Sequence, residues 1–333
     1  MNTINHDFLE MLHDAADTLA HASSIVITGH RNPDGDAVGS CLAIARLLQN
    51  QGKLATVVLP KKDVGSPKIL DGFGEVVDIQ DFDFSSEFDL LVVMDCGSRK
   101  RICSERFLEC HPRLGILNID HHGAELFGNC NLVVVDFSST GELVFHLART
   151  AGWKLDPQSA EALWTAIASD TDHFTLPATT AQTLHCAGTL HECGIRAAWL
   201  NDQLFRQVKP GAIQLQAKAL SSLELWLNGT VATIALAPED YRQTECTKQD
   251  SDAFPLIPLS VAGCKLGIFF YPRPVDNPMV TRISIRSREN SPVTALMLAN
   301  AFGGSGHTHS AAAAIHAPLT EAKQQVKAYL EQR

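Results

Sequence analysis

The chain has 333 residues and a mass of 36.2 kDa, which is enough for one large domain or two of ordinary size. Apolar residues make up 45% of it, so the chain can bury a core and is not a disordered tail. Acidic residues outnumber basic ones by 37 to 27, and the formal charge of −10 excludes a protein that coats nucleic acid through a net basic surface.

The charge is unevenly distributed along the chain. Residues 1–200 carry 26 acids and 14 bases, whereas residues 201–333 carry 11 and 13. This favours two domains with different tasks, with solvation of the surface as an equal alternative. The nine cysteines include no CxxC pair, and the sequence has neither a signal-peptide core nor an apolar stretch that could span a membrane. We therefore expect a soluble cytoplasmic protein with reduced thiols and no membrane partner.

Short apolar runs alternate with helical patterns in the first half of the chain. The spacing of apolar residues predicts a helix over 37–50. Strands are expected at 25–30, 56–60, 89–95, 115–120 and 132–136. This alternation is typical of an α/β fold with a mainly parallel sheet. Several of the expected strands end in a polar residue. Because open α/β sheets bind ligands at the carboxyl ends of their strands, we expect a site there.

The pattern then becomes helical over 140–170, where Gly152 and Pro157 separate two helices. Helical character continues over 181–193 and 197–207. Beyond this stretch, Asn228-Gly229 lies between two strand-like runs and predicts a hairpin. The runs of that hairpin are 222–227 and 230–236, further strands are expected at 265–271 and 281–286, and helices at 292–301 and 320–331.

These elements predict an α/β protein of two domains. The N-terminal domain is expected to have a mainly parallel sheet, and a smaller C-terminal α/β domain a mixed sheet. A helical linker would join them, because the stretch between them is not enriched in Ser, Gly or Pro. The expected bounds are 1–187 for the first domain, 188–211 for the linker and 212–333 for the second domain.

Four segments of the first half place acids and histidines at the ends of predicted elements. They are His30 with Asp34 and Asp36, then Asp95, then Asp120-His121-His122, and finally Asp170 with Asp172 and His173. Each is a weak signal alone, because a single Asp there is usually a turn or cap residue. Together they supply ligands for two divalent ions. Mixed imidazole and carboxylate ligands suit Mn²⁺, Fe²⁺ or Zn²⁺ better than Ca²⁺.

The four segments read GHRNPDGDAVGS, VVMDCG, NIDHH and SDTDHF, in this order. They resemble motifs I to IV of the DHH phosphoesterase superfamily, and the resemblance spans roughly residues 25–175. It implies two divalent metal ions, with Mn²⁺ as the expected ion. By position, one ion would be bound by His30, Asp34 and Asp95, and the other by Asp36, Asp95, His121 and Asp170, so that Asp95 bridges them.

The same resemblance implies the catalytic roles. His122 would face the scissile phosphate, where it could stabilise the phosphoryl oxygens or protonate the leaving group. Asp120 would orient a neighbouring histidine. Two ions could activate a shared water for in-line attack on phosphorus. The fourth motif departs from many relatives: Asp172 is a weaker alternative to Asp170 as ligand, and we expect His173 to pack beside the site.

A glycine-rich segment, Phe302-Gly303-Gly304-Ser305-Gly306-His307, marks the second half. Its backbone N–H groups could approach an anion, and we expect a helix to begin after it. A turn without a ligand is the default interpretation. Upstream, however, Arg282, Arg286 and Arg288 alternate along an expected strand. Three like charges on one face repel unless they are solvated or meet an anion such as phosphate.

This half resembles the substrate-binding domain that accompanies many DHH domains. Two positions depart from the family loop, with Ser305 at the third glycine and Ala313-Ala314 without the glycine that follows. The residues that would bind the substrate's phosphate are Arg286, Gly304, Ser305, Gly306 and His307.

The two-domain layout resembles superfamily members that hydrolyse short oligonucleotides and the 3′-phosphate of adenosine 3′,5′-bisphosphate (pAp). We therefore expect a metal-dependent phosphoesterase acting on a short oligonucleotide or a mononucleotide phosphate. Long nucleic acid is not an expected partner, since it needs an extended basic track. An exopolyphosphatase-like hydrolase is the alternative, an inactive nucleotide-binding regulator a weaker one, and a homodimer stays open.

Overall fold

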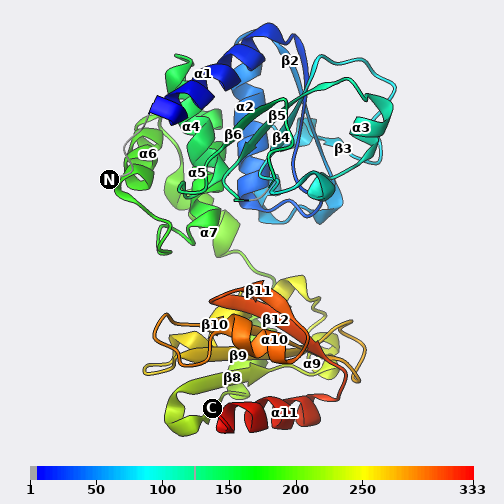
Figure 1. Cartoon of the computed structure of the whole chain (residues 1–333), viewed down its shortest axis with the longest axis vertical. Helices are drawn as coiled ribbons and strands as arrows, with labels where there is room; N and C mark the ends of the chain where they lie inside the picture. The colour runs from blue at the N-terminus through cyan, green and yellow to red at the C-terminus, as the bar shows by residue number, and fades with distance from the viewer. Residues whose placement is uncertain (1–5, 124) are drawn as a thin grey trace. The chain divides into compact units, whose positions relative to one another are not determined.

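A computed structural model describes residues 6–123 and 125–333, and the chain divides into two compact units (Figure 1). The first unit extends to Gln207 and the second is Val208–Arg333. The expected linker, residues 188–211, spans this division. Most of it belongs to the first unit, because helix α7 (Ala197–Phe205) packs against the helices of that unit.

The first unit is built on a six-stranded sheet in the order β3-β2-β1-β4-β5-β6, and every neighbouring pair is parallel. The expected parallel α/β architecture is therefore confirmed. The strand order reverses between β1 and β4, so the carboxyl ends of these two strands flank the crevice where such sheets bind ligands. The strands are β1 (Ser24–Thr28), β2 (Leu54–Leu59), β3 (Val77–Asp78), β4 (Leu90–Met94), β5 (Gly115–Asp120) and β6 (Cys130–Val133).

Helices cover both faces of this sheet. The larger core lies beneath α1, α2, α4 and α5, and a smaller core lies beneath α3 on the opposite face (Figure 1). Helix α1 was not predicted from the sequence, although its buried Phe8, Leu12, Ala15 and Leu19 are spaced as on one helix face. The bounds are α1 (His6–His21), α2 (Gly35–Gln49), α3 (Arg106–Cys110), α4 (Thr140–Thr150), α5 (Pro157–Asp170) and α6 (Ala181–Glu192).

Two glycines let α2 and α5 approach each other closely. A Cβ atom on Gly39 would lie 2.4 Å from the carbonyl oxygen of Ala162 and 2.9 Å from the amide nitrogen of Ala166. A Cβ atom on Gly35 would lie 1.8 Å from Ser169 Oγ. Since such distances are far below van der Waals contact, any larger residue would push the two helices apart.

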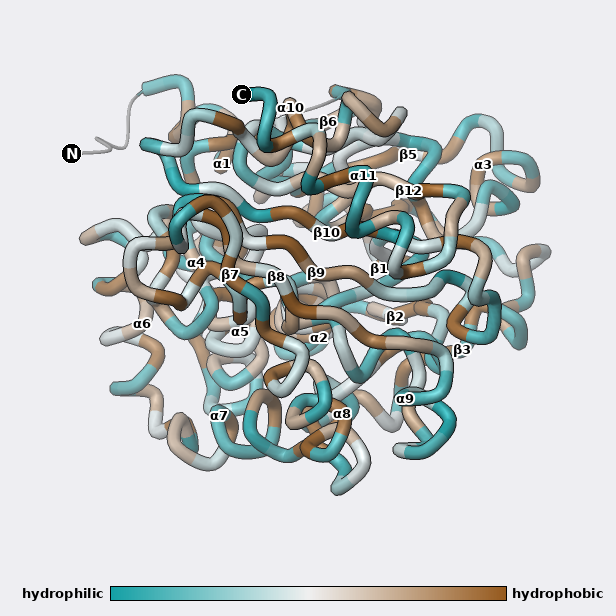
Figure 2. Tube along the Cα trace, turned by 90° about the horizontal axis from the view of Figure 1, so that it is seen from below, coloured by the Kyte–Doolittle hydropathy of each residue, from teal (hydrophilic) through white to brown (hydrophobic). Residues whose placement is uncertain are grey.

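The second unit has a mixed sheet in the order β11-β12-β10-β9-β8-β7, in which only the β8–β9 pair is parallel. The expected mixed sheet is confirmed, and the predicted hairpin corresponds to β7 and β8. Much of β9 is hydrophobic (Figure 2), whereas β10 alternates polar and apolar residues. The strands are β7 (Glu224–Trp226), β8 (Val231–Ala235), β9 (Leu266–Pro272), β10 (Thr281–Ser287), β11 (Ser305–His307) and β12 (Ser310–Ile315).

Helices α10 and α11 pack on one face of the second sheet, and α8 and α9 pack on the other. The helix expected over 197–207 corresponds to α7, whereas α8, which begins at Pro210, was not predicted. The bounds are α8 (Pro210–Ser221), α9 (Pro238–Gln243), α10 (Ala295–Ala301) and α11 (Leu319–Glu331). Short 3₁₀ turns are Lys61–Asp63, Ser66–Ile69, Phe73–Glu75, Arg99–Arg101, Leu227–Gly229, Gln249–Ser251, Phe254–Leu256 and Pro258–Ser260.

Two expectations about this unit are wrong. The glycine-rich segment is followed by a strand, β12, and not by a helix. Its alanines pair with β10, and Ala311 and Ala313 pack into the core with α10, so tertiary packing overrides their helix propensity. Arg288 lies beyond the end of β10, where its guanidinium donates hydrogen bonds to the carbonyl oxygens of Cys264 and Leu259.

All nine cysteines are free thiols, and five of them are buried. Among the residues that the structure describes, no helix combines the length and apolarity required to cross a membrane.

The close contact between α2 and α5 generates a prediction. Replacing Gly39 with Ala should lower the free energy of unfolding by about 1–3 kcal/mol, because the added methyl group meets backbone atoms that have no room to move. Gly188→Ala is the matched control. Gly188 lies in α6, and a Cβ atom added there would meet nothing within 4 Å, so alanine should stabilise the helix slightly. Equal thermal unfolding midpoints for the two variants would contradict this view of the contact.

Candidate metal centre

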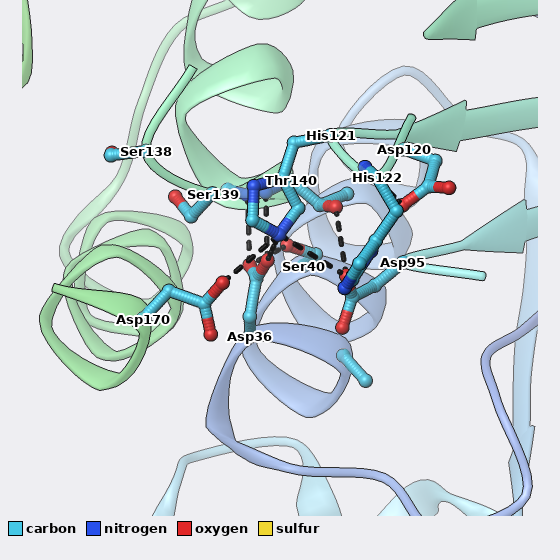
Figure 3. A network of polar contacts seen from close by, with 12 residues as sticks. Asp36, Ser40, Asp95, Asp120, His121, His122, Ser138, Ser139, Thr140 and Asp170 are labelled. Carbon is cyan, nitrogen blue, oxygen red and sulfur yellow. Dashed lines mark hydrogen bonds and ion pairs between the residues drawn. The ribbon is translucent and has the colours of Figure 1, made fainter. Parts of the chain in front are cut away.

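The polar residues at the strand ends converge on one edge of the first sheet (Figure 3). Three groups of three side chains at this edge have ligand atoms that lie within 4.8 Å of one another. The first is His30, Asp34 and Asp95, the second is Asp36, His121 and Asp170, and the third, Asp95, His121 and His122, shares a residue with each of them. The six residues expected to bind metal are therefore brought together. The first group contains the same residues as one set implied by the resemblance, and the second contains the other set without Asp95, whose Oδ1 lies 3.7 Å from His121 Nε2.

The first group joins the ends of β1 and β4. His30 Nε2 lies 3.4 Å from Asp95 Oδ2 and 3.8 Å from Asp34 Oδ2. His30 and Asp95 are buried, whereas the Asp34 side chain is 57% exposed. Asp34 has a second task, because its Oδ1 accepts hydrogen bonds from the backbone N–H groups of Asp36 and Ala37 and so caps α2.

The second group surrounds an imidazole nitrogen. His121 Nε2 lies 2.9 Å from Asp170 Oδ2, 3.7 Å from Asp95 Oδ1 and 3.8 Å from Asp36 Oδ2. This nitrogen is buried, yet within the described part of the chain no hydrogen bond satisfies it. A buried nitrogen without a hydrogen bond, facing three carboxylates, fits a divalent cation held between them.

Asp36 is the most enclosed of these ligands. Its Oδ2 accepts a hydrogen bond of 2.7 Å from Thr140 N, and its Oδ1 accepts one of 2.9 Å from Gly141 N and one of 3.0 Å from Ser40 Oγ. The first turn of α4 thus aims its free N–H groups at this carboxylate, as helix N-termini do with anions. Ser40, Thr140 and Gly141 were not recognised in the sequence. The Ser138-Ser139-Thr140 run was the available signal, since it is typical of a helix start.

Asp95 occupies the position between the two groups. Its Oδ2 faces His30, while its Oδ1 lies 3.3 Å from His122 Nδ1 and accepts a hydrogen bond of 3.3 Å from Thr140 Oγ1. Its backbone has φ of 53°, in the left-handed region that residues with a side chain seldom adopt. Such strain is typical of functional sites and is held here by the surrounding contacts.

The electrostatics of the cluster favour a bound cation. Burial, followed by the charge of Asp95, raises the pKa of Asp36 well above its ordinary value. Burial also raises the pKa of Asp170, opposed by its ion pair with His121. For His30, burial lowers the pKa, but hydrogen bonds with Asp34 and Asp95 outweigh it and raise the pKa to about 9. Buried carboxylates this close together repel unless a cation lies among them, so these residues fit divalent metal ions.

His122 and Asp120 form a pair at the rim of the cluster. Asp120 Oδ1 lies 2.8 Å from His122 Nδ1 and also accepts a hydrogen bond of 3.1 Å from the backbone N–H of His122. The hydrogen bond with Asp120, followed by that with Asp95, raises the pKa of His122 to about 10. The His122 side chain is 41% exposed, whereas Asp120 is buried. A charged, fixed and accessible imidazole therefore faces outward from the cluster.

The last motif ends in an unusual turn. Asp172, His173 and Phe174 all have positive φ, between 43° and 65°. The His173 ring packs against Phe205, with 3.9 Å between ring centroids. Asp172 Oδ2 lies 3.5 Å from Thr175 Oγ1, and neither Asp172 nor His173 belongs to any group of possible metal ligands found among the described residues.

The expected phosphate-binding residues lie in the second unit. Arg286 on β10 is paired with Ser310 on β12, and Ser310 is paired with His307 on β11. Directly paired residues share a face of the sheet, so these three form one row across three strands. Ser305, Gly306 and His307 are exposed, and a Cβ atom on Gly304 would lie 2.2 Å from the carbonyl oxygen of Ala312.

Arg282 and Arg286 lie on the same face of the sheet as this row, and their guanidinium groups are not fully hydrogen-bonded. Burial lowers the pKa of Arg286, whose Nη1 donates to the carbonyl oxygen of Ile285 at 3.0 Å and to Ser284 Oγ at 3.4 Å. Arg282 Nε is buried, and none of the described residues accepts a hydrogen bond from it. A half-buried guanidinium without a carboxylate partner fits a phosphate. Arg288, which bonds backbone carbonyls instead, is not part of this group.

A parallel sheet that gathers paired histidine and carboxylate ligands at its strand ends defines the class of protein. The chain belongs to the DHH family, whose N-terminal domain matches residues 24–167. This confirms the resemblance to the DHH superfamily, and the matched residues include the first three motifs. The match ends within α5, three residues before Asp170.

Particular members of the family are similar over most of the chain. The bifunctional oligoribonuclease and PAP phosphatase NrnA of Thermus thermophilus is 30% identical over 295 residues, which are 87% of this chain and 84% of that protein. The protein of the same description from Bacillus subtilis is 26% identical over 306 residues, 90% of this chain and 91% of that protein. The crystal structure of an exopolyphosphatase-related protein from Bacteroides fragilis shares the fold, with a TM-score of 0.85, 24% identity, and coverage of 100% of this chain and 98% of that one.

The contacts of Thr140 generate a prediction. Thr140→Val keeps the backbone N–H that binds Asp36 but removes the hydroxyl that positions Asp95. We expect the affinity for Mn²⁺, measured by isothermal titration calorimetry, to fall about 10- to 100-fold. Thr189→Val is the control, because the hydroxyl of Thr189 bonds only a carbonyl of its own helix among the contacts described. Unchanged affinity in Thr140→Val would show that the hydroxyl does not support the centre.

Proposed function

We propose that this protein is a two-metal-dependent phosphoesterase that hydrolyses short oligonucleotides and removes the 3′-phosphate of pAp. The observation that carries the proposal is the paired ligand set around Asp95 at the switch point of the sheet. The substrate class is supported by two relatives, similar over more than four fifths of this chain, that are described as oligoribonucleases and PAP phosphatases.

The residues that would hold the ions are His30, Asp34 and Asp95 on one side and Asp36, Asp95, His121 and Asp170 on the other. Their imidazole and carboxylate donors suit Mn²⁺, which we propose as the ion. When bound, two such ions supply Lewis-acid polarisation of a phosphoryl oxygen and a nucleophilic water at neutral pH.

His122 acts on the substrate side of this cluster. Asp120 holds His122 Nδ1, which leaves Nε2 as the nitrogen that can face a phosphoryl group. A cationic imidazole there stabilises charge on the phosphoryl oxygens and can donate a proton to the leaving oxygen. Because Asp120 is buried and fixed by two hydrogen bonds to His122, the imidazole is oriented before substrate binds.

The row of Arg286, Ser310 and His307 would bind a phosphate of the substrate that is not cleaved. One arginine and a few neighbouring donors are enough for a mononucleotide or a short oligonucleotide, whereas a long strand needs an extended basic track. The second unit carries only two more basic than acidic residues, which supports a small, local phosphate-binding site. We call the row of Arg286, Ser310 and His307 the clamp. The nine free cysteines are consistent with action in a reducing cytoplasm.

Phosphate release by the purified full-length protein tests the proposed function. With Mn²⁺, we expect turnover of pAp and of 5′-phosphorylated RNA dinucleotides, and little turnover of polyphosphate. Asp95→Ala should lower turnover about 1,000-fold or more, because it removes the side chain shared by both proposed sets of ligands. Preference for polyphosphate would overturn the substrate class. If protein with bound Mn²⁺ hydrolysed none of these substrates, the proposal that it is a phosphoesterase would be overturned.

The clamp makes a separate kinetic prediction. Arg286→Ala should raise KM for pAp about 10- to 100-fold with little change in kcat, because the lost hydrogen bonds hold a phosphate that does not react. Arg242→Ala is the control. Its side chain lies in α9 of the same unit, is 71% exposed and pairs with Glu239. A fall in kcat at constant KM in Arg286→Ala would remove this residue from the clamp.

A further inference from the structure

A second cluster of ligand-type side chains lies within the helices of the first unit, outside the groups described above. Glu142 and His146 are one turn apart on α4, and Cys186 faces them from α6. A carboxylate oxygen, an imidazole nitrogen and the thiol sulfur all lie within 4.8 Å of one another. The three residues are 1%, 6% and 0% exposed, so water does not compensate their polar groups.

The carboxylate of Glu142 is only half satisfied. Its Oε2 accepts hydrogen bonds from Ser138 N at 3.1 Å, Ser138 Oγ at 2.6 Å and Thr183 Oγ1 at 3.0 Å. Its Oε1 is equally buried, but within residues 6–123 and 125–333 it has no hydrogen-bond partner. An unpartnered oxygen of a buried carboxylate costs free energy unless a cation or a donor faces it.

The other two side chains place an imidazole nitrogen and a thiol sulfur close together, joined by a long hydrogen bond. His146 Nε2 lies 3.8 Å from Cys186 Sγ. The rings of Phe8, Phe137 and Phe145 surround the imidazole. The imidazole is therefore enclosed by aromatic rings and has its Nε2 next to the thiol of Cys186.

A fourth donor is within reach. The side-chain amide of Gln182, one turn before Cys186 on α6, lies 3.5 Å from His146 Nε2 and 4.0 Å from Cys186 Sγ. Rotating this amide by half a turn presents its oxygen, an acceptor, in place of its nitrogen. Four donors from two facing helices would then surround one point, which is the ligand number of a structural zinc site.

We propose that Glu142, His146 and Cys186 form a structural zinc site, with Gln182 as a fourth ligand. The charges favour Zn²⁺, because one carboxylate and one thiolate balance a divalent ion and leave no net charge in the core. A soft sulfur ligand also selects Zn²⁺ against Mn²⁺, so the two kinds of site would hold different metals. Binding releases the thiol proton of Cys186 to solvent, and no electron is transferred.

The site would stabilise the helix that positions Asp36. The first turn of α4 donates two N–H groups to Asp36, and Glu142 follows these residues directly. Ser138, which binds Glu142, lies apart from the carboxylates of the metal centre (Figure 3). The zinc would therefore fix α4 against α6 without touching the substrate.

Metal analysis and X-ray absorption on the full-length protein test the proposal. After the protein is saturated with Mn²⁺, we expect it to retain about one equivalent of zinc with one sulfur neighbour at about 2.3 Å. Cys186→Ser should remove the sulfur neighbour and most of the zinc. Cys193→Ser, which changes another thiol close by in the chain, should keep both.

The wild-type measurement alone decides the proposal if Cys186→Ser does not fold. Zinc-loaded protein without a sulfur neighbour, or protein that binds no zinc beyond the manganese centre, would overturn it. A sulfur neighbour that persists in folded Cys186→Ser would assign the zinc to a different thiol and would also overturn it. Because these readouts do not depend on phosphate release, they are independent of the proposed activity.

Discussion

The first unit is organised around the repulsion between four carboxylates held at one sheet edge. Asp36 and Asp95 are almost fully buried, and Asp34 and Asp170 lie close enough to affect their ionisation. Neutral side chains alone would not make this cluster of four carboxylates favourable, because the charges are too close together and too poorly hydrated. Three features offset this repulsion. Histidines lie between the carboxylates, the first turn of α4 donates hydrogen bonds to Asp36, and the ligand atoms are arranged so that cations could bind between them.

Close packing of the helices makes that arrangement attainable. Gly35 and Gly39 let α2 lie directly on α5, so the start of one helix and the end of the other reach the same point. The strand order supplies the rest, because the reversal between β1 and β4 places His30 and Asp95 side by side. The ligand cluster therefore depends on the close packing of α2 against α5, which is why a methyl group on α2 is expected to matter.

Much of this could be predicted from the sequence. Apolar runs ending in His30, Asp95 and Asp120 indicated both the strands and the edge that carries the ligands, since parallel strands are buried on both faces. The alanines of β12 led to the wrong prediction of a helix after the glycine-rich segment. Helix propensity is a local property of the sequence, whereas the pairing of β12 with β10 joins residues distant in the chain. The hydrogen bonds of Thr140 to Asp36 and Asp95 join residues distant in the chain, and the buried group around Glu142 depends on how α4 meets α6. Neither has a spacing signature.

Each half of the chain has its own hydrophobic core. The residues proposed to bind metal belong to the first half, and the arginine row belongs to the second. This division has an evolutionary consequence. With the roles proposed above, substitutions around Arg286 and β11 would change which phosphorylated molecule is bound while the proposed metal ligands stay unchanged. The departures at Ser305 and Ala313-Ala314 lie in that half, whereas the positions expected to bind metal all retain His or Asp. Specificity can therefore diverge among descendants of this chain faster than chemistry does.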